Sequence, residues 1–364
     1  MRLKNLNGEI TMITFKQIKQ RLTENNINYE ILNLQNDFSI IICEYGGRIF
    51  GPFYKNGESI LWVNSAFSQT EQASELFGSK EWNVGGDRIW LAPELAYNVK
   101  NRKDFHGSYI VQNELDPGNY VINRNNHNEI SLINKFQLDL LEGQNYKKSL
   151  CLDRKIRRIE NPLKNTKRYD DLKKVMFCGF EQIVTLSDKK KDDQLSEVWN
   201  LTQMNAGGRL YINTVSYPEY TDYYEPIDNE YQELNEKHVK LKITGNRRYK
   251  VGYNSAFLTG RCGYHNKTSD KTSYLFIRDF LNNPSAQYTK EPADLPGVRG
   301  NSLHVYNDNG DFGGFAELEC SGQPIGGKTN TDEGTEQIIT WLFYGDNQNL
   351  TEVSKILLGV DISQ

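Results

Sequence analysis

The 364-residue chain carries 43 Lys and Arg against 47 Asp and Glu, and its net charge of −4 creates no long-range field that would recruit nucleic acid or an anionic membrane. It has no apolar run of about 18 residues, as a membrane-spanning helix needs, and residues 1–22 lack the apolar region and cleavage site of a signal peptide. Its five cysteines are scattered and never spaced Cys-x-x-Cys, so we expect free thiols in a cytoplasmic protein without a nucleic-acid or membrane partner.

The chain opens with an amphipathic helix. Thr14 is a suitable N-cap, Gln17 follows it as in a capping box, and three apolar residues mark one face, namely Phe15, Ile18 and Leu22. We expect this helix to belong to an N-terminal extension over residues 1–30, followed by a single β domain over residues 31–364. A last short helix is predicted over 350–359.

Strand patterns dominate the remainder of the chain. They are short, rich in β-branched and aromatic residues, and bounded by Gly, Asn, Asp and Pro. They cover residues 38–47, 59–67, 129–141, 175–186, 208–216, 238–245, 249–258, 273–281, 312–320 and 337–345. Because strands and helices do not alternate, a doubly wound α/β fold is excluded and an all-β fold is predicted.

Two stretches are less typical of a core. Residues 152–174 are strongly basic, and residues 216–238 are acidic and rich in tyrosine. We interpret both as charged, solvated excursions, although long connections on a β scaffold often carry function. Residues 307–314, "NDNGDFGG", lack the last glutamate of a calcium loop and predict a hairpin turn.

The segment "NVGGDRIWLAPE", residues 83–94, combines features that neither a plain core strand nor a solvated loop requires. Its two glycines permit positive φ angles and close approach of another group. Arg88 offers a planar set of donors for hydroxyls or a carboxylate, and Trp90 offers a stacking face. We expect Arg88 to face a ligand and Glu94 to orient Arg88 or bind hydroxyls. The alternative is a buried Arg–Glu pair within the scaffold.

Two further segments contain candidate ligand-binding residues. In "EVWNLTQMNAGGRLYI", residues 197–212, Trp199, Asn200 and Gln203 cluster before a Gly-Gly-Arg that ends at Arg209, and amides beside an aromatic ring suit sugar hydroxyls. Glu317 and Glu319 are two apart on a predicted strand and therefore share a face. Mutual repulsion and burial should raise one pKa, and we expect the raised pKa at Glu319. On an edge strand the two carboxylates would simply be solvated.

The order of several motifs resembles the galactose mutarotase-like superfamily. They are "EYGGRIFGPF", "WNVGGDRIWLAPE", "VWNLTQMNAGGRLYI", "YKVGYNSAF", "FIRDF" and "FAELECSGQP", and they extend from about Gly46 to the C-terminus. The resemblance implies a β-supersandwich of large, mostly antiparallel sheets with a sugar-binding cleft. It also implies aldose 1-epimerase chemistry, with Glu319, in "LECSGQP", as the general base. "DFHG" makes His106 a candidate for sugar contact.

One departure from that family pattern bears on activity. The family carries its acid histidine where this chain reads "VWNLTQM", which contains none. Either His106, His265 or His304 supplies the acid, or the cleft only binds. We therefore predict a carbohydrate ligand, mono- or oligosaccharide, with no cofactor and no metal, and we leave the oligomeric state open. The alternatives are a binding or regulatory module, and a polysaccharide lyase that uses Arg88 and Arg209 on a uronate.

Overall fold

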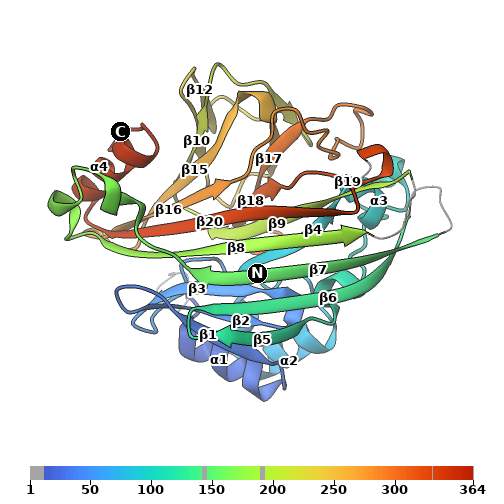
Figure 1. Cartoon of the computed structure of the whole chain (residues 1–364), viewed down its shortest axis with the longest axis horizontal. Helices are drawn as coiled ribbons and strands as arrows, with labels where there is room; N and C mark the ends of the chain where they lie inside the picture. The colour runs from blue at the N-terminus through green and yellow to red at the C-terminus, as the bar shows by residue number, and fades with distance from the viewer. Residues whose placement is uncertain (1–11, 142–145, 189–192, 330, 364) are drawn as a thin grey trace.

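Two large antiparallel sheets form the molecule (Figure 1). The computed structural model describes residues 12–141, 146–188, 193–329 and 331–363. In order across the first sheet, the strands are β1 (Tyr29–Asn33), β2 (Phe38–Cys43), β3 (Ile49–Tyr54), β4 (Asp87–Ala92), β9 (Leu195–Asn205), β18 (Phe315–Ser321), β17 (Asn301–Asn307), β14 (Tyr249–Asn254) and β11 (Tyr220–Asp222), with β19 (Ile325–Gly326) paired to β9.

The second sheet packs against the first. Across it, the order is β12 (Gln232–Leu234), β13 (His238–Lys242), β10 (Arg209–Thr214), β15 (Leu258–Lys267), β16 (Ser273–Phe280), β20 (Glu333–Gly345), β8 (Met176–Asp188), β7 (Lys147–Arg158), β6 (Glu129–Asp139) and β5 (Val121–Asn126). Apolar side chains from both sheets, among them Ile89, Leu318, Phe180 and Val184, form one core. The predicted all-β supersandwich is confirmed.

Four α-helices lie outside the sheets in the described part of the chain. They are α1 (Phe15–Glu24), α2 (Thr70–Gly78), α3 (Glu94–Asn98) and α4 (Asn347–Leu357). The predicted capping box is present, because Thr14 and Gln17 bond each other's backbone N–H. Helices α1 and α2 lie together beside β1 and β2, well apart from α4 (Figure 1). None of these helices is long and apolar enough to cross a membrane.

The apolar face of α1 packs on the first sheet. Ile18 and Leu22 are buried in a cluster with Ile41, Phe50 and Phe53 of β2 and β3. The division of the chain at residue 30 stays a prediction.

Part of the basic stretch was wrongly expected to be a solvated connection. Its first residues, 152–158, complete strand β7, and Leu152, Arg154 and Ile156 are buried. Strand alternation explains the difference, because Lys155 and Arg157 point to the opposite, solvent-facing side. The hairpin expected at 307–314 joins the antiparallel pair β17 and β18, and Asp308 accepts hydrogen bonds from three of its backbone N–H groups.

A buried polar network connects the two sheets at Asp87, on β4. Its carboxylate binds Arg154 from β7 and lies 2.9 Å from Nη2 of Arg278, from β16. Asn200 and Thr202, on β9, donate to the same carboxylate. Burial alone would raise the pKa of Asp87, but the two guanidinium groups and these hydrogen bonds lower it. Asp87 is therefore held as an anion between the sheets.

We predict that Asp87→Ala lowers the free energy of unfolding by about 3–5 kcal/mol, because it leaves two buried guanidinium groups without their counter-ion. Urea denaturation measures the loss. Asp171→Ala is the control: Asp171 is exposed and pairs with Arg168 at 3.0 Å, and such surface pairs contribute about 0–1 kcal/mol. Equal losses in the two variants would contradict a stabilising role for the network.

Candidate functional site

The face of the first sheet that points away from the second carries the candidate site. Side chains alternate along β4, so Asp87 faces the second sheet while Arg88 and Trp90 face the other way. Pairing places Arg88 beside Leu201, Leu201 beside Glu319, and Glu319 beside His304. Glu317 precedes Glu319 by two residues on the same face of β18, in register with Gln203 and Tyr306. Four strands thus bring their polar residues to one patch.

Two glycines fix the entry into β4. Gly85 and Gly86 have φ angles of 109° and 78°, and a Cβ on Gly85 would lie 2.6 Å from the Trp62 carbonyl oxygen. Only glycine accepts both constraints at low energy. The backbone can therefore turn tightly against the segment at Trp62 and start β4 with Asp87 facing the core.

A cavity of about 390 Å³ covers this patch. Such a volume lies within the range of roughly 300–1,000 Å³ typical of ligand sites. Its aromatic lining residues are Trp82, Trp90, Phe105, Tyr109, Trp199, Tyr224, Tyr306, Phe312 and Phe315. The rest of the lining is mostly polar or charged: Arg88, Glu94, His106, Arg248, Lys250, Glu317 and Glu319, with Leu201. We call it the site cavity.

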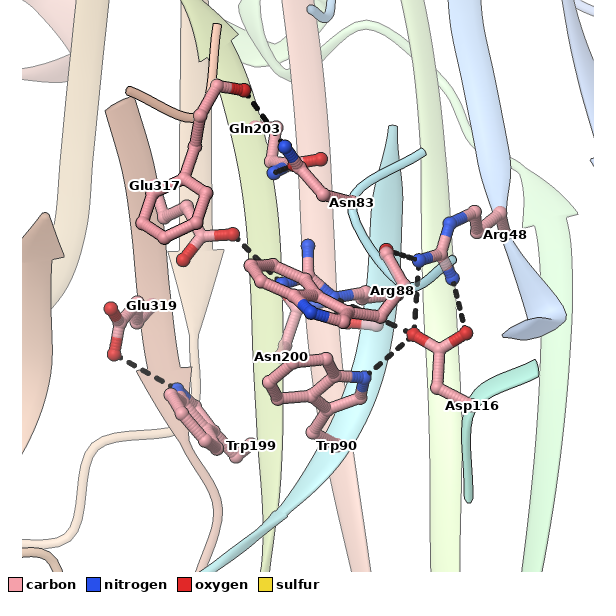
Figure 2. A network of polar contacts seen from close by, with 12 residues as sticks. Arg48, Asn83, Arg88, Trp90, Asp116, Trp199, Asn200, Gln203, Glu317 and Glu319 are labelled. Carbon is pink, nitrogen blue, oxygen red and sulfur yellow. Dashed lines mark hydrogen bonds and ion pairs between the residues drawn. The ribbon is translucent and has the colours of Figure 1, made fainter. Parts of the chain in front are cut away.

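Arg88 is fully buried and lines the site cavity, and Figure 2 shows it within a network of polar contacts with Glu317 and Asp116. Its Nη2 donates to Oε1 of Glu317 at 2.8 Å, and its guanidinium lies 4.4 Å from the ring centre of Trp90. Trp90 is itself held by a 2.8 Å hydrogen bond to Asp116, which also binds Arg48. Nη1 of Arg88 has no hydrogen-bond partner among the described residues. It is a buried donor without a partner among these residues, on the site face of the sheet.

One of the two roles expected for Glu94 was to orient Arg88, and this expectation is wrong because Glu94 binds other residues. It lies at the start of α3, where its Oε2 is 3.2 Å from Nζ of Lys250 and its Oε1 accepts from Tyr109. Glu94 begins α3 two residues after the end of β4, and it lines the site cavity. A hydroxyl-binding role for Glu94 stays a prediction.

Glu319 is held by two lysines. Its Oε2 is 2.6 Å from Nζ of Lys290 and accepts from the indole N–H of Trp199 at 3.0 Å, while its Oε1 is 3.4 Å from Nζ of Lys250. Burial alone would raise the pKa of Glu319, but the ammonium groups and these hydrogen bonds lower it. The expected increase in the pKa of Glu319 is wrong.

The raised pKa belongs to Glu317 instead. Burial raises it, the charge of Glu319 adds to the increase, and Arg88 opposes it. Figure 2 shows the two side chains leaving the same strand, with Glu317 directed to Arg88 and Glu319 to Trp199. Strand β18 is central, with β9 and β17 on either side. The solvated edge-strand alternative is therefore wrong, and the pKa values of the two carboxyl groups are displaced in opposite directions.

The two lysines near Glu319 titrate differently. Burial and the charge of Lys250 lower the pKa of Lys290 to about 8, although its contact with Glu319 opposes this. Burial acts on Lys250 in the same direction, but Glu319 and Glu94 together raise its pKa. Both ammonium groups lie over the ring of Trp199, at 5.1 Å for Lys250 and 3.6 Å for Lys290. Near neutral pH, Lys250 is cationic and Glu319 is an anion.

The three candidate histidines are far from equivalent. His106 is exposed, lines the site cavity, and has Nδ1 3.4 Å from Nη2 of Arg248. His304 is fully buried beside Glu319, bonds the Tyr223 hydroxyl at 2.9 Å, and does not line the cavity. Burial and the nearby lysines lower the pKa of His304, so it is neutral. His265 lies on β15 of the second sheet.

Three other expected ligand-binding residues lie outside the site cavity. Arg209, on β10, pairs across the second sheet with His265. Asn200 faces the second sheet, where it bonds Asp87 and Arg278. Gln203 is on the site face, but its amide donates to Asn83 and it does not line the cavity (Figure 2). Arg209 lies outside the site because its strand belongs to the other sheet. Asn200 lies outside it because its side chain points to the opposite face of β9.

Several residues of the site were not predicted. Lys250 is a lysine at a buried position of the strand pattern "YKVGYN", and that pattern could have indicated an internal charge. Tyr224 comes from the tyrosine-rich stretch 216–238, whose aromatic content was the available signal. Lys290 lies in an irregular segment, and its sequence neighbours give no signal. Among the described residues, no group of His, Cys, Asp and Glu could hold a metal ion.

Comparison with known proteins identifies the family. The fold and the site define a β-supersandwich protein with a charged, aromatic cavity on one sheet. The chain belongs to DUF6786, a family of unknown function, whose model matches residues 13–364. No curated protein matches the sequence.

Solved structures with some similarity include two from Lactobacillus acidophilus. One is a galactose mutarotase related enzyme, with a TM-score of 0.48 and 8% identity over 88% of this chain and 98% of that chain. The other is galactose 1-epimerase from strain NCFM, with a TM-score of 0.48 and 10% identity over 88% and 95% of the two chains. Similarity this low assigns no activity to the chain.

We predict that Lys290→Met weakens the acid dependence of stability. Glu319, with its lowered pKa, contributes stability that is present above the unfolded pKa of about 4.3 and is lost as pH falls through the folded pKa. Removing the Lys290 ammonium raises that folded pKa, so less stability is lost on acidification. Urea denaturation between pH 7 and pH 3 measures the change.

Lys173→Met is the matched control for this experiment, because Lys173 is exposed and pairs with Asp170. Its acid dependence should equal that of the unsubstituted protein. If Lys290→Met gives the same curve as Lys173→Met, Lys290 does not set the ionisation of Glu319.

Proposed function

We propose that the chain binds a sugar in the site cavity and transfers protons on it with Glu317 and Glu319, as an aldose 1-epimerase-like enzyme. The observation that carries the proposal is a pair of buried carboxyl groups on one strand face. Glu317 pairs with Arg88 and Glu319 with Lys250 and Lys290, so that their pKa values are displaced in opposite directions. A pair of carboxyl groups held in different protonation states is the usual arrangement for an acid and a base in one site.

The rest of the lining supports a sugar. Aromatic rings such as Phe105 and Phe312 offer apolar faces for the C–H side of a pyranose, while the hydroxyls need nearby donors and acceptors. Nη1 of Arg88 is a free donor, and Oε1 of Glu319 has no hydrogen-bond donor among the described residues. The motif order noted in the sequence points to the same ligand class.

The proposed reaction interconverts the anomers of an aldose. The Glu319 carboxylate accepts the proton of the anomeric hydroxyl, and the Glu317 carboxylic acid donates a proton to the ring oxygen. The bond between C1 and the ring oxygen breaks, which gives the open-chain aldehyde. Rotation about the C1–C2 bond and reversal of both proton transfers close the ring with the other configuration. No other reactant is consumed, and both carboxyl groups return to their starting state.

Glu319→Gln and Glu317→Gln should each reduce anomer exchange by about 10²–10⁴-fold, because each removes one proton-transfer group. NMR exchange spectroscopy and polarimetry on a panel of free aldoses and sugar phosphates measure the rate. Glu333→Gln is the control, since Glu333 is exposed on β20 of the second sheet. Sugar binding should survive in all three variants.

Two outcomes would contradict this proposal in different ways. If the unsubstituted protein binds sugars but accelerates no exchange, the chain is a carbohydrate-binding module. The ion pairs of Glu317 with Arg88 and of Glu319 with Lys290 favour a carbohydrate-binding module, because they already occupy the two carboxyl groups. If exchange occurs and survives both substitutions, the acid and base have been misassigned, and His106 and Lys250 are the next groups to replace.

The exchange rate should depend on pH with two limbs. Activity requires Glu319 ionised and Glu317 protonated, so the rate rises as pH passes the lowered pKa and falls as pH passes the raised pKa. Because Arg88 lowers the pKa of Glu317, Arg88→Gln should move the alkaline limb to higher pH. The rate profile from about pH 3 to pH 10 tests this. An alkaline limb that stays in place would show that Glu317 is not the acid.

A further inference from the structure

A second cavity, of about 900 Å³, adjoins the site cavity. We call it the outer cavity. The two cavities share six lining residues, namely Glu94, Phe105, His106, Tyr224, Arg248 and Lys250. Ligand sites typically have volumes of roughly 300–1,000 Å³. The volume of the site cavity is near the lower end of that range, and the volume of the outer cavity is near its upper end. They are two parts of one cleft.

The junction between the two cavities is aromatic. The rings of Phe105 and His106 lie 6.5 Å and 5.7 Å from that of Tyr224, and the guanidinium of Arg248 lies 5.0 Å over the same ring. Nε of Arg248 is buried and has no hydrogen-bond partner among the described residues. The junction therefore presents flat apolar faces together with one unused donor.

Beyond the junction, the outer cavity carries both signs of charge. Arg102 and Arg247 contribute donors, while Glu225, Glu291 and Asp294 contribute acceptors. Several of these groups already pair, such as Arg102 with Glu291 at 2.5 Å and Arg247 with Asp228 at 3.2 Å. A balanced set of donors and acceptors beside aromatic rings suits a neutral, hydroxylated ligand better than an anion.

We propose that the natural ligand is an oligosaccharide, with its reducing-end ring in the site cavity and the next sugar unit in the outer cavity. The proposal rests on the proposed function, because it assumes that the site cavity holds a sugar ring. It adds the substrate class: a chain of at least two units, aligned so that the linking oxygen passes Arg248 at the junction.

A third cavity also adjoins the site cavity. It measures about 410 Å³, and it shares only Trp82 and Phe312 with the site cavity. Those two rings lie 5.8 Å apart and form the wall between the cavities. The outer cavity shares a wider boundary and has an unused donor at its junction. We therefore place the second sugar unit in the outer cavity.

Isothermal titration with glucose, galactose and mannose, and with their 1,4-linked di- and trisaccharides, tests this proposal. We expect a disaccharide of at least one series to bind about tenfold more tightly than its monosaccharide. Ala293→Phe and Asp294→Trp place bulk in the outer cavity, and each should abolish that gain while leaving monosaccharide affinity unchanged. Asp294 is exposed, so its replacement does not disturb packing.

Ser65→Phe is the matched control, because Ser65 lines only the third cavity. It should change neither affinity. Equal affinities for mono- and disaccharides would overturn the proposal, as would a gain that Ser65→Phe removes and the outer-cavity variants retain. Failure of every sugar to bind, whatever its length, would instead overturn the proposed function.

Discussion

The ion pairs of Asp87 with Arg154 and Arg278 fix the geometry on which the rest of the structure depends. Two arginines of the second sheet and two side chains of β9 hold one carboxylate of β4. A strand cannot slip by one residue without exposing that anion to the opposite face. With Asp87 fixed inward, Arg88 and Trp90 must face outward, where the cavity lies. The scaffold and the site are thus set by adjacent residues of one strand.

The charge arrangement in the site follows from that geometry. Glu317, Glu319 and Glu94 are nearly buried, and isolated buried carboxylates are costly. Among the described residues, Arg88 alone pairs with Glu317 and does not offset its burial, so the pKa of Glu317 is raised. Lys250 and Lys290 both reach Glu319 and outweigh its burial, so the pKa of Glu319 is lowered. The difference arises from which cations each one reaches, and not from exposure, since both are buried.

Local pattern predicted much of the fold and part of the site. Alternating strands, the Thr14–Gln17 capping box and the shared face of Glu317 and Glu319 depend on residues near each other in sequence, and all three are present. The sheet to which a strand belongs depends on long-range pairing, so Arg209 and His265 were placed at the wrong site. The pKa of Glu319 also depends on long-range contacts, since Lys250 and Lys290 come from distant segments.

The alternation of side chains along β9 also bears on the histidine that is absent from this stretch. The stretch "VWNLTQM" forms part of β9, where Trp199 and Leu201 line the site cavity and Asn200 points to the second sheet. A histidine at position 200 would contact Asp87 and Arg278, not a ligand. In the proposed reaction, the acid must therefore come from another lining residue of the cavity. Glu317, with its raised pKa and its place next to Glu319 on β18, meets that requirement from within the same sheet.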